Sequence, residues 1–402
     1  MRALVYHALQ PTGTLAAHVN ELFDIDISDA ALAQRRARLP WEVFEQLLGL
    51  ALRPLTNARE HPLAFYKGLR LVGLDGTLFS LTNTPQLLAC LSKAAARRLV
   101  AAFAKLGMCA LVELGAHKPL AALIGRAGES ESALGLRLLA RLPERSLLIL
   151  DRLWGVGKWV DQIGAACAGR RSHWLVRVRR GLKAKLVKAL GDGSAVVELQ
   201  YREPSGQKGR VQVREVRGVV VGRDAKRTEL RLWTSLLEAR KYPALELLRL
   251  YAQRWEQELC YKELKVEKRD GELLNSHTVE TAAQELVCVL VAQALVARKR
   301  VEAGRLGQGD VLRVSFTKVL WVMRAVWLWL AVGEGELSAR QEARLVQRAL
   351  RMVAAQLSEP RRMRSWPRAV RQPVTGWPRL TNNHSHAGEI RYELTPASKA
   401  LS

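Results

Sequence analysis

Two short apolar runs that each end in an aspartate constrain the fold of this chain most strongly. LRLVGLD ends at Asp75, and SLLILD ends at Asp151. A short run of large apolar residues predicts a strand that is buried on both faces. An aspartate at the carboxyl end of such a strand lies where open α/β sheets bind their ligands. The two runs therefore predict an α/β fold with a functional site near Asp75 and Asp151.

A later segment, YAQRWEQELCYKELK, has the pattern of one amphipathic helix. Its residues Tyr251, Arg254, Glu258 and Lys265 are three, four and seven positions apart. This spacing places their side chains along one helix face, where Glu258 is the candidate metal ligand among groups suited to binding phosphate. The simpler alternative is that Glu258 forms an ion pair with Lys262 or Arg254 on a solvated face.

The two aspartates and Glu258 together form a candidate three-carboxylate site. Mg²⁺ prefers oxygen ligands, and two such ions about 3.5–4 Å apart activate the attacking oxygen and stabilise the leaving oxygen of a phosphodiester. With these residues the chain resembles DDE transposases of the bacterial insertion-sequence-four (IS4) family. The family signature is Tyr, two residues, Arg, three residues, Glu, six residues and Lys, and it is filled here by Tyr251, Arg254, Glu258 and Lys265. VGLDGT matches the family around the first catalytic aspartate, Asp75, and LILDRLWG matches it around the second, Asp151.

The resemblance implies a ribonuclease-H-like catalytic core in which the first and fourth strands, carrying Asp75 and Asp151, lie side by side. It implies cleavage of DNA at insertion-sequence ends and joining of the freed 3′-hydroxyl to target DNA. The residues it assigns to catalysis and to metal binding are Asp75, Asp151 and Glu258. The expected cofactor is Mg²⁺, with Mn²⁺ as a substitute. Those it assigns to the DNA phosphates are Tyr251, Arg254 and Lys265. The implied partners are double-stranded DNA of the element ends and target, and a second copy of the chain, as a homodimer on paired ends.

The net charge of +25 points to a polyanionic partner, although it does not distinguish RNA from DNA. Between residues 152 and 235 there are 19 basic and seven acidic residues. Strand patterns separated by turn-rich linkers predict a β-rich insertion there, where the family also has one. Arg210 and Arg214 alternate onto one strand face and are expected to bind DNA phosphates. Trp233 is a candidate for stacking on an unpaired base, and the alternative is an interior tryptophan.

The sequence divides into five expected parts. Residues 1–60 form a helical N-terminal region, 61–180 and 237–305 form the two parts of the core, 181–236 form the basic insertion, and 306–402 form a helical region with a basic tail. Ser28 is a candidate N-cap, and Pro40 opens the next helix of the first part. That part either recognises the DNA ends through Arg35, Arg36 and Arg38 or packs against the core. The tail, RRMRSWPRAVRQPVTGWPR (361–379), either lies on a nucleic acid or partner, or is disordered.

The remaining features place the chain in a reducing, aqueous compartment. Five cysteines without CxxC pairs are expected to be buried thiols, and neither disulfides nor a zinc site are expected. No secretory signal is apparent, and the apolar stretch at 319–332 is shorter than a membrane span and suits a buried helix. We therefore expect a cytoplasmic protein, associated with the nucleoid when bound to DNA, and no membrane partner.

Two other functions fit part of this pattern. One is a noncatalytic DNA-binding protein derived from a transposase, although six matched positions argue against decay of the site. The other is a ribonuclease-H-like nuclease that cuts DNA without strand transfer.

Overall fold

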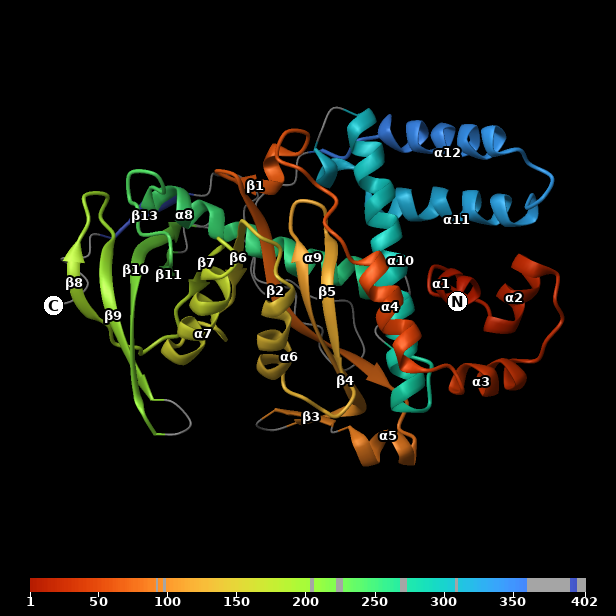
Figure 1. Cartoon of the computed structure of the whole chain (residues 1–402), viewed down its shortest axis with the longest axis horizontal. Helices are drawn as coiled ribbons and strands as arrows, with labels where there is room; N and C mark the ends of the chain where they lie inside the picture. Colours follow the sequence, from red (N-terminus) through yellow and green to blue (C-terminus); the bar gives the residue numbers. More distant parts are fainter. Residues whose placement is uncertain are drawn as a thin grey trace. The chain divides into compact units, whose positions relative to one another are not determined.

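The computed structural model describes residues 1–91, 93–96, 99–202, 206–221, 227–267, 273–307, 310–359 and 391–395. The chain forms two compact units, each built from segments that are separated in sequence (Figure 1). The first unit contains Met1–Ile149, Ala166–Ser172 and Gln253–Glu359. The second contains Leu150–Ala165, His173–Ala252 and the described residues after 359.

The first unit begins with four helices: α1 (Arg2–His7), α2 (Leu15–Phe23), α3 (Asp29–Ala37) and α4 (Trp41–Ala51). The predicted helix start at Ser28 is confirmed, because its side chain accepts a hydrogen bond from the Ala31 N–H. Pro40 immediately precedes α4, also as predicted. The helical character of the N-terminal region therefore follows from local sequence signals.

The sheet of the first unit is built around β2 (Leu69–Leu81). The strand order is β3-β4-β2-β6, and β5 pairs with β4. The bounds are β3 (Lys93–Ala96), β4 (Leu99–Glu113), β5 (Lys118–Gly125) and β6 (Ser146–Leu150), with short β1 (Phe65–Tyr66) antiparallel and β12 (Leu273–Leu274) parallel to β2. The strand that ends just before Asp151 thus lies next to the strand that carries Asp75, as the expected order of the core requires.

One predicted detail of β2 is wrong. LRLVGLDG and TLFSLT each have a strand pattern, which predicts two strands joined by a tight turn near Gly76, whereas β2 runs without interruption for 13 residues. Gly76 pairs with Cys109 of β4 in the antiparallel ladder. The glycine leaves room for the Glu131 side chain, which occupies the space that a Cβ would take. The chain does not turn at this position.

Helices cover the rest of the first unit. They include α5 (Pro85–Cys90), α6 (Glu131–Leu138), α9 (Trp255–Lys262), α10 (Val279–Leu306), α11 (Phe316–Val332) and α12 (Ala339–Ala354). The long helix α10 lies against α4, α11 and α12 (Figure 1). Of the described helices, α10 alone is long and apolar enough to span a membrane, but 83% of its most apolar window is buried inside the protein, which is typical of a core helix.

Helix α11 corresponds to the apolar stretch that the sequence predicted as a buried helix. It is buried on one face only, because Trp321 and Trp329 retain 73% and 65% of their exposed area. The cysteines differ from the prediction in one case, since Cys90 is exposed while the other four are buried.

The second unit is a sheet with the strand order β7-β11-β10-β9-β8, with β13 also paired to β10. Its strands are β7 (His173–Arg177), β8 (Lys185–Ala189), β9 (Ala195–Arg202), β10 (Lys208–Val221), β11 (Arg227–Thr234) and β13 (Arg391–Leu394). Helix α8 (Ala244–Leu250) packs on β10 and β13. Helix α7 (Gly157–Ala168) precedes β7 in sequence. The β-rich insertion predicted from strand patterns is therefore present, and β8, β9, β10 and β11 lie within it.

Candidate active site

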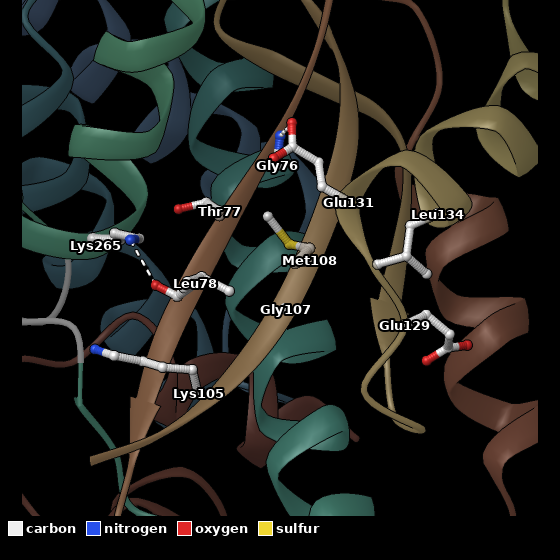
Figure 2. Close-up of a pocket in the computed structure, with 10 residues that line it drawn as sticks. All are labelled: Gly76, Thr77, Leu78, Lys105, Gly107, Met108, Glu129, Glu131, Leu134 and Lys265. Carbon is white, nitrogen blue, oxygen red and sulfur yellow. Dashed lines mark hydrogen bonds between the residues drawn. The ribbon is translucent and has the colours of Figure 1, made fainter. Parts of the chain in front are cut away.

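The site is centred on the backbone of β2 immediately after Asp75. Asp75 is half-buried, and its Oδ1 lies 3.0 Å from the N–H of Gly76. The same N–H donates to Oε1 of Glu131, also at 3.0 Å (Figure 2). Glu131 is the first residue of α6, so the structure brings a second carboxylate to the strand that carries the predicted one.

Helix α9, which carries Glu258, is bound to the same strand. The hydroxyl of Tyr261 donates a hydrogen bond to the Asp75 carbonyl oxygen at 2.6 Å. Burial, and after it the charge of Asp75, raises the pKa of Tyr261 well above its usual value, so the hydroxyl stays protonated as a donor. Gln257 packs so closely on Gly73 that a Cβ there would lie 2.3 Å from its Oε1. The first unit therefore holds the helix of Glu258 directly against the strand of Asp75.

Glu258 itself forms an ion pair with Arg254 across one helical turn. This is the alternative that the sequence left open for Glu258. The two side chains retain about a fifth of their exposure, 22% for Glu258 and 21% for Arg254. Because both charged groups reach solvent, the pair does not seal Glu258 away from a cation or Arg254 from a phosphate.

The signature segment is not the single α-helix that the spacing predicted. Tyr251–Arg254 form a 3₁₀ turn, α9 follows, and Glu263–Glu267 form a π turn. On this π turn the ammonium of Lys265 donates to the Leu78 carbonyl at 2.8 Å and lies 5.1 Å from the centroid of the Phe79 ring. Lys265 is thus fixed over the end of β2 by these contacts. Tyr251 is buried and belongs to the second unit.

A pocket of about 520 Å³ opens beside Gly76. It is lined by Gly76, Thr77, Leu78, Lys105, Gly107, Met108, Glu129, Glu131, Leu134 and Lys265 (Figure 2). Lys105 of β4 donates to the Ser80 hydroxyl at 2.6 Å. Two cations from different elements and two carboxylates therefore share one pocket next to Asp75. No sequence signal points to Lys105 or Glu131, because neither belongs to a spaced motif and only the folded sheet brings them to one pocket.

Behind α9, a buried ionic cluster supports the helix. His117 lies between Glu256 (Nε2 to Oε2, 2.7 Å) and Glu263 (Nδ1 to Oε2, 2.9 Å), and Arg300 pairs with Glu263 at 3.1 Å. Burial by itself lowers the pKa of His117, but the charge of Glu263 and the hydrogen bonds to both glutamates outweigh it and raise the pKa. A protonated His117 balances the two carboxylates, and the cluster anchors both ends of α9 to the turn before β5 and to α10.

Asp151 belongs to the second unit. Its Oδ1 accepts a hydrogen bond from the Leu153 N–H at 2.8 Å, which holds the carboxylate in a local turn after β6. Leu153 is followed by the fully buried Trp154. The convergence of Asp151 with Asp75 and Glu258 stays a prediction.

The donor chemistry of the first unit fits a hard divalent cation. Asp75 and Glu131 accept from one shared N–H, and a cation between carboxylates of this kind would offset their mutual repulsion. Among the described residues, no group of three or more His, Cys, Asp or Glu side chains is already gathered for metal binding. Glu258 would have to turn from Arg254 to join such a site.

One of the two predicted DNA-binding arginines in the second unit requires correction. Arg214 is fully buried, where it donates to the Tyr242 carbonyl at 2.7 Å and pairs with Asp192. It therefore stabilises the sheet and is not available to DNA phosphates. Arg210, four residues earlier on β10, is exposed, and it remains a candidate.

Trp233 is an interior tryptophan, as the alternative interpretation held. Only 1% of its surface is exposed, and its indole N–H donates to Glu215 at 2.7 Å. A ring in this position has no face on which a base can stack, so base stacking is excluded in this structure.

The three N-terminal arginines differ in their environments. Arg36 donates to the side chains of Gln284 and Ser276, which supports packing against the core as its role. Arg35 and Arg38 are exposed. The basic tail at 361–379 lies outside the described residues.

Comparison with known proteins identifies the family of the chain. Residues 67–295 match the family described as Transposase DDE domain, and because the match covers more than half of the chain, the chain belongs to this family. It is 27% identical over 281 residues to the transposase InsG of insertion sequence element IS4 from Escherichia coli (strain K12), which confirms the resemblance to IS4 transposases. The aligned part covers 69% of this chain and 62% of InsG.

A solved structure with a partly similar arrangement is the piggyBac transposase synaptic complex with hairpin DNA. The TM-score is 0.45 at 8% sequence identity, and the match covers 86% of this chain and 74% of the piggyBac chain.

Proposed function

We propose that this chain cuts DNA at the ends of an insertion sequence and joins the freed 3′-hydroxyl to target DNA by a two-metal DDE mechanism. The observation that carries the proposal is the hydrogen bond from Tyr261 to the Asp75 carbonyl, which fixes the helix of Glu258 on the strand of Asp75. Membership of the transposase family supplies the reaction class. The proposal includes action in the bacterial cytoplasm on nucleoid DNA.

In this proposal the carboxylates of Asp75, Asp151 and Glu258 hold the metal ions. Two bound Mg²⁺ ions, or Mn²⁺ in their place, would lower the pKa of the attacking oxygen and neutralise charge on the leaving 3′ oxygen. Glu258 would exchange its ion pair with Arg254 for this role when DNA binds. Such an exchange is possible because both charged groups keep about a fifth of their exposure, so solvent and a bound cation can replace the ion pair.

The cations around this site would hold the DNA backbone. Arg254, once separated from Glu258, presents a planar fork that suits two phosphate oxygens, whereas Lys265 acts as a point charge beside Leu78. Exposed Arg210 in the second unit would add a phosphate contact away from the reacting bond. A homodimer on paired ends is part of the proposal, since both ends of an element must be cut and joined together.

The test is a cleavage and joining assay with DNA that carries candidate end sequences, Mg²⁺ and the full chain. Asp75→Ala, Asp151→Ala and Glu258→Ala are each expected to abolish cleavage while leaving DNA binding intact. Asp26→Ala, which removes an exposed loop carboxylate, is the matched control and is expected to cleave normally. Cleavage by any of the three variants would remove that residue from the site.

The same assay separates the two other functions. If the wild-type chain binds the ends without nicking them, the chain is a noncatalytic DNA-binding protein. If it nicks DNA but yields no joined products, it is a nuclease without strand transfer.

A further inference from the structure

Glu131 contacts the strand of Asp75 more closely than any role as a surface carboxylate requires. Its Oε1 accepts the N–H of Gly76 at 3.0 Å, and this is the same N–H that lies 3.0 Å from Oδ1 of Asp75. Figure 2 shows the Glu131 carboxylate turned onto the strand at Gly76, at one end of the pocket. Two carboxylates therefore compete for one backbone donor.

The packing shows that this contact is built into the fold. A Cβ added to Gly76 would lie 2.5 Å from Cγ and 2.6 Å from Cδ of Glu131, so the stem of Glu131 fills the space where a side chain would otherwise be. The start of α6 is fixed by Ser130, whose hydroxyl accepts the Ala133 N–H at 3.3 Å. Glu131 therefore leaves the helix in a defined direction.

A buried thiol lies on the strand next to Gly76. Burial first, and then the charges of Glu131 and Asp75, raise the pKa of the Cys109 thiol, which lies opposite Gly76 on β4.

We propose that Glu131 is a positioning residue of the transposase site: by sharing the Gly76 N–H, it weakens the hold of this N–H on Oδ1 of Asp75 and so eases the turn of the Asp75 carboxylate toward metal ions. Without Glu131, Oδ1 of Asp75 is the remaining acceptor at this N–H and stays folded back on it. The inference rests on the proposed function, because it concerns the orientation of a residue assigned there to metal binding.

The experiment compares Glu131→Ala, Glu131→Gln and the matched control Glu129→Ala in the full chain. Glu129 lines the same pocket but accepts from the Ala127 N–H, not from Gly76. Binding of Mn²⁺ without DNA is measured by electron paramagnetic resonance, and single-turnover cleavage is measured beside it. Loss of one positioning hydrogen bond predicts about tenfold weaker Mn²⁺ binding and a matching fall in cleavage for Glu131→Ala.

The two companion variants separate positioning from charge. Glu131→Gln keeps an acceptor for the Gly76 N–H, so its Mn²⁺ affinity and its cleavage rate are expected to stay within about threefold of the wild-type values. For Glu129→Ala both quantities are expected to equal those of the wild type. The inference is overturned if Glu131→Ala binds Mn²⁺ and cleaves as wild type does. It is also overturned if Glu131→Gln or Glu129→Ala is as defective as Glu131→Ala, because the pocket's charge would then be the cause.

A stability measurement keeps the inference testable if Glu131→Ala folds poorly. Gly76→Ala is expected to lower the Tm in the wild-type background and to have little further effect together with Glu131→Ala, since the added methyl then has room. Additive effects would contradict the contact. Asp75→Ala distinguishes failure of the proposed function from failure of the role of Glu131. If Asp75→Ala retains Mn²⁺ binding and cleavage, the proposed function fails. If Asp75→Ala loses both while Glu131→Ala loses neither, only the role of Glu131 fails.

Discussion

Replacement of Arg214 by methionine tests the reassignment of this residue from DNA binding to support of the second unit's sheet. The Arg214 side chain is fully buried and donates to the Ser194 hydroxyl at 2.8 Å, the Leu236 carbonyl at 3.0 Å and the Tyr242 carbonyl at 2.7 Å. It also pairs with Asp192. Methionine fills much of the volume but supplies no donor, so all of these contacts are lost together.

The magnitude follows from the groups left behind. Removing one partner of a buried ion pair costs about 3–5 kcal/mol, and each buried carbonyl left without a donor costs about 1–3 kcal/mol. The two costs are not added, because both describe the loss of the same side chain. Asp192 limits the loss, since it is 21% exposed and keeps its hydrogen bonds from Ser194 and from the Ala244 N–H. We therefore expect Arg214→Met to destabilise the unit by about 3–4 kcal/mol.

Arg210→Met is the matched control, because Arg210 lies on the same strand but is exposed. It is expected to change stability by no more than about 0.5 kcal/mol. Hydrogen exchange of peptides from β9 and β10 measures the stability of this region directly, without requiring the whole chain to unfold in two states. Faster exchange is expected for Arg214→Met and unchanged exchange for Arg210→Met.

DNA binding at several salt concentrations completes the comparison. If Arg210 contacts a phosphate, its replacement lowers the slope of log K against log salt by about 1. Arg214→Met is expected to leave the slope unchanged under conditions in which it is folded. Wild-type exchange in β9 and β10 combined with a reduced salt slope for Arg214→Met would refute the structural role and restore the DNA contact.

Three further predictions concern the first unit. Tyr261→Phe removes the donor to the Asp75 carbonyl and is expected to cost about 1 kcal/mol in denaturant unfolding and to slow single-turnover cleavage; cleavage at the wild-type rate would contradict the positioning of α9 by this bond. Burial lowers the pKa of Lys118 to about 7, so above that pH the unfolded chain binds one more proton than the folded chain, and stability rises by up to about 1.4 kcal/mol per pH unit until the side chain titrates in the unfolded state as well. Lys118→Met is expected to lack this rise between pH 7 and 9, and equal slopes for the two proteins would disprove it. Arg36→Ala is expected to expose α3 to limited proteolysis while DNA affinity is kept, and an intact α3 with lost DNA affinity would instead indicate end recognition.

The parts of the fold that the sequence predicted are those with local signals. The run SLLIL is buried at every position of β6, as an uninterrupted apolar run indicates. Ser28 and Pro40 marked helix starts because capping and proline geometry act within a few residues. The signature residues were identified by their spacing, and three of the four lie on the helical segment that packs against β2 in the first unit.

The parts that were missed depend on residues distant in sequence. Gly76 looked like a turn because glycine favours turns, yet it continues β2 in the ladder with β4, and its missing side chain leaves room for Glu131, 55 residues later. Arg214 shares a strand face with Arg210 by alternation, but β10 enters the core between them, and its partner Asp192 comes from another loop. The π turn at Lys265 is stabilised by a carbonyl of β2 that the helix pattern does not contain.

The segmented arrangement of the two units has a consequence for dissecting the protein. The chain leaves the first unit after Ile149 and, apart from Ala166–Ser172, returns to it only at Gln253. Gln253 lies between Tyr251 and Arg254 of the signature. No single cut in the sequence separates the units, so a terminal truncation within this span leaves both of them incomplete. The chain passes from the second unit to the first within the signature, so an insertion there changes the connection between the units as well as the chemistry. Loss of activity after an insertion between Tyr251 and Arg254 would therefore not identify a catalytic residue, whereas side-chain replacements that keep the backbone length would.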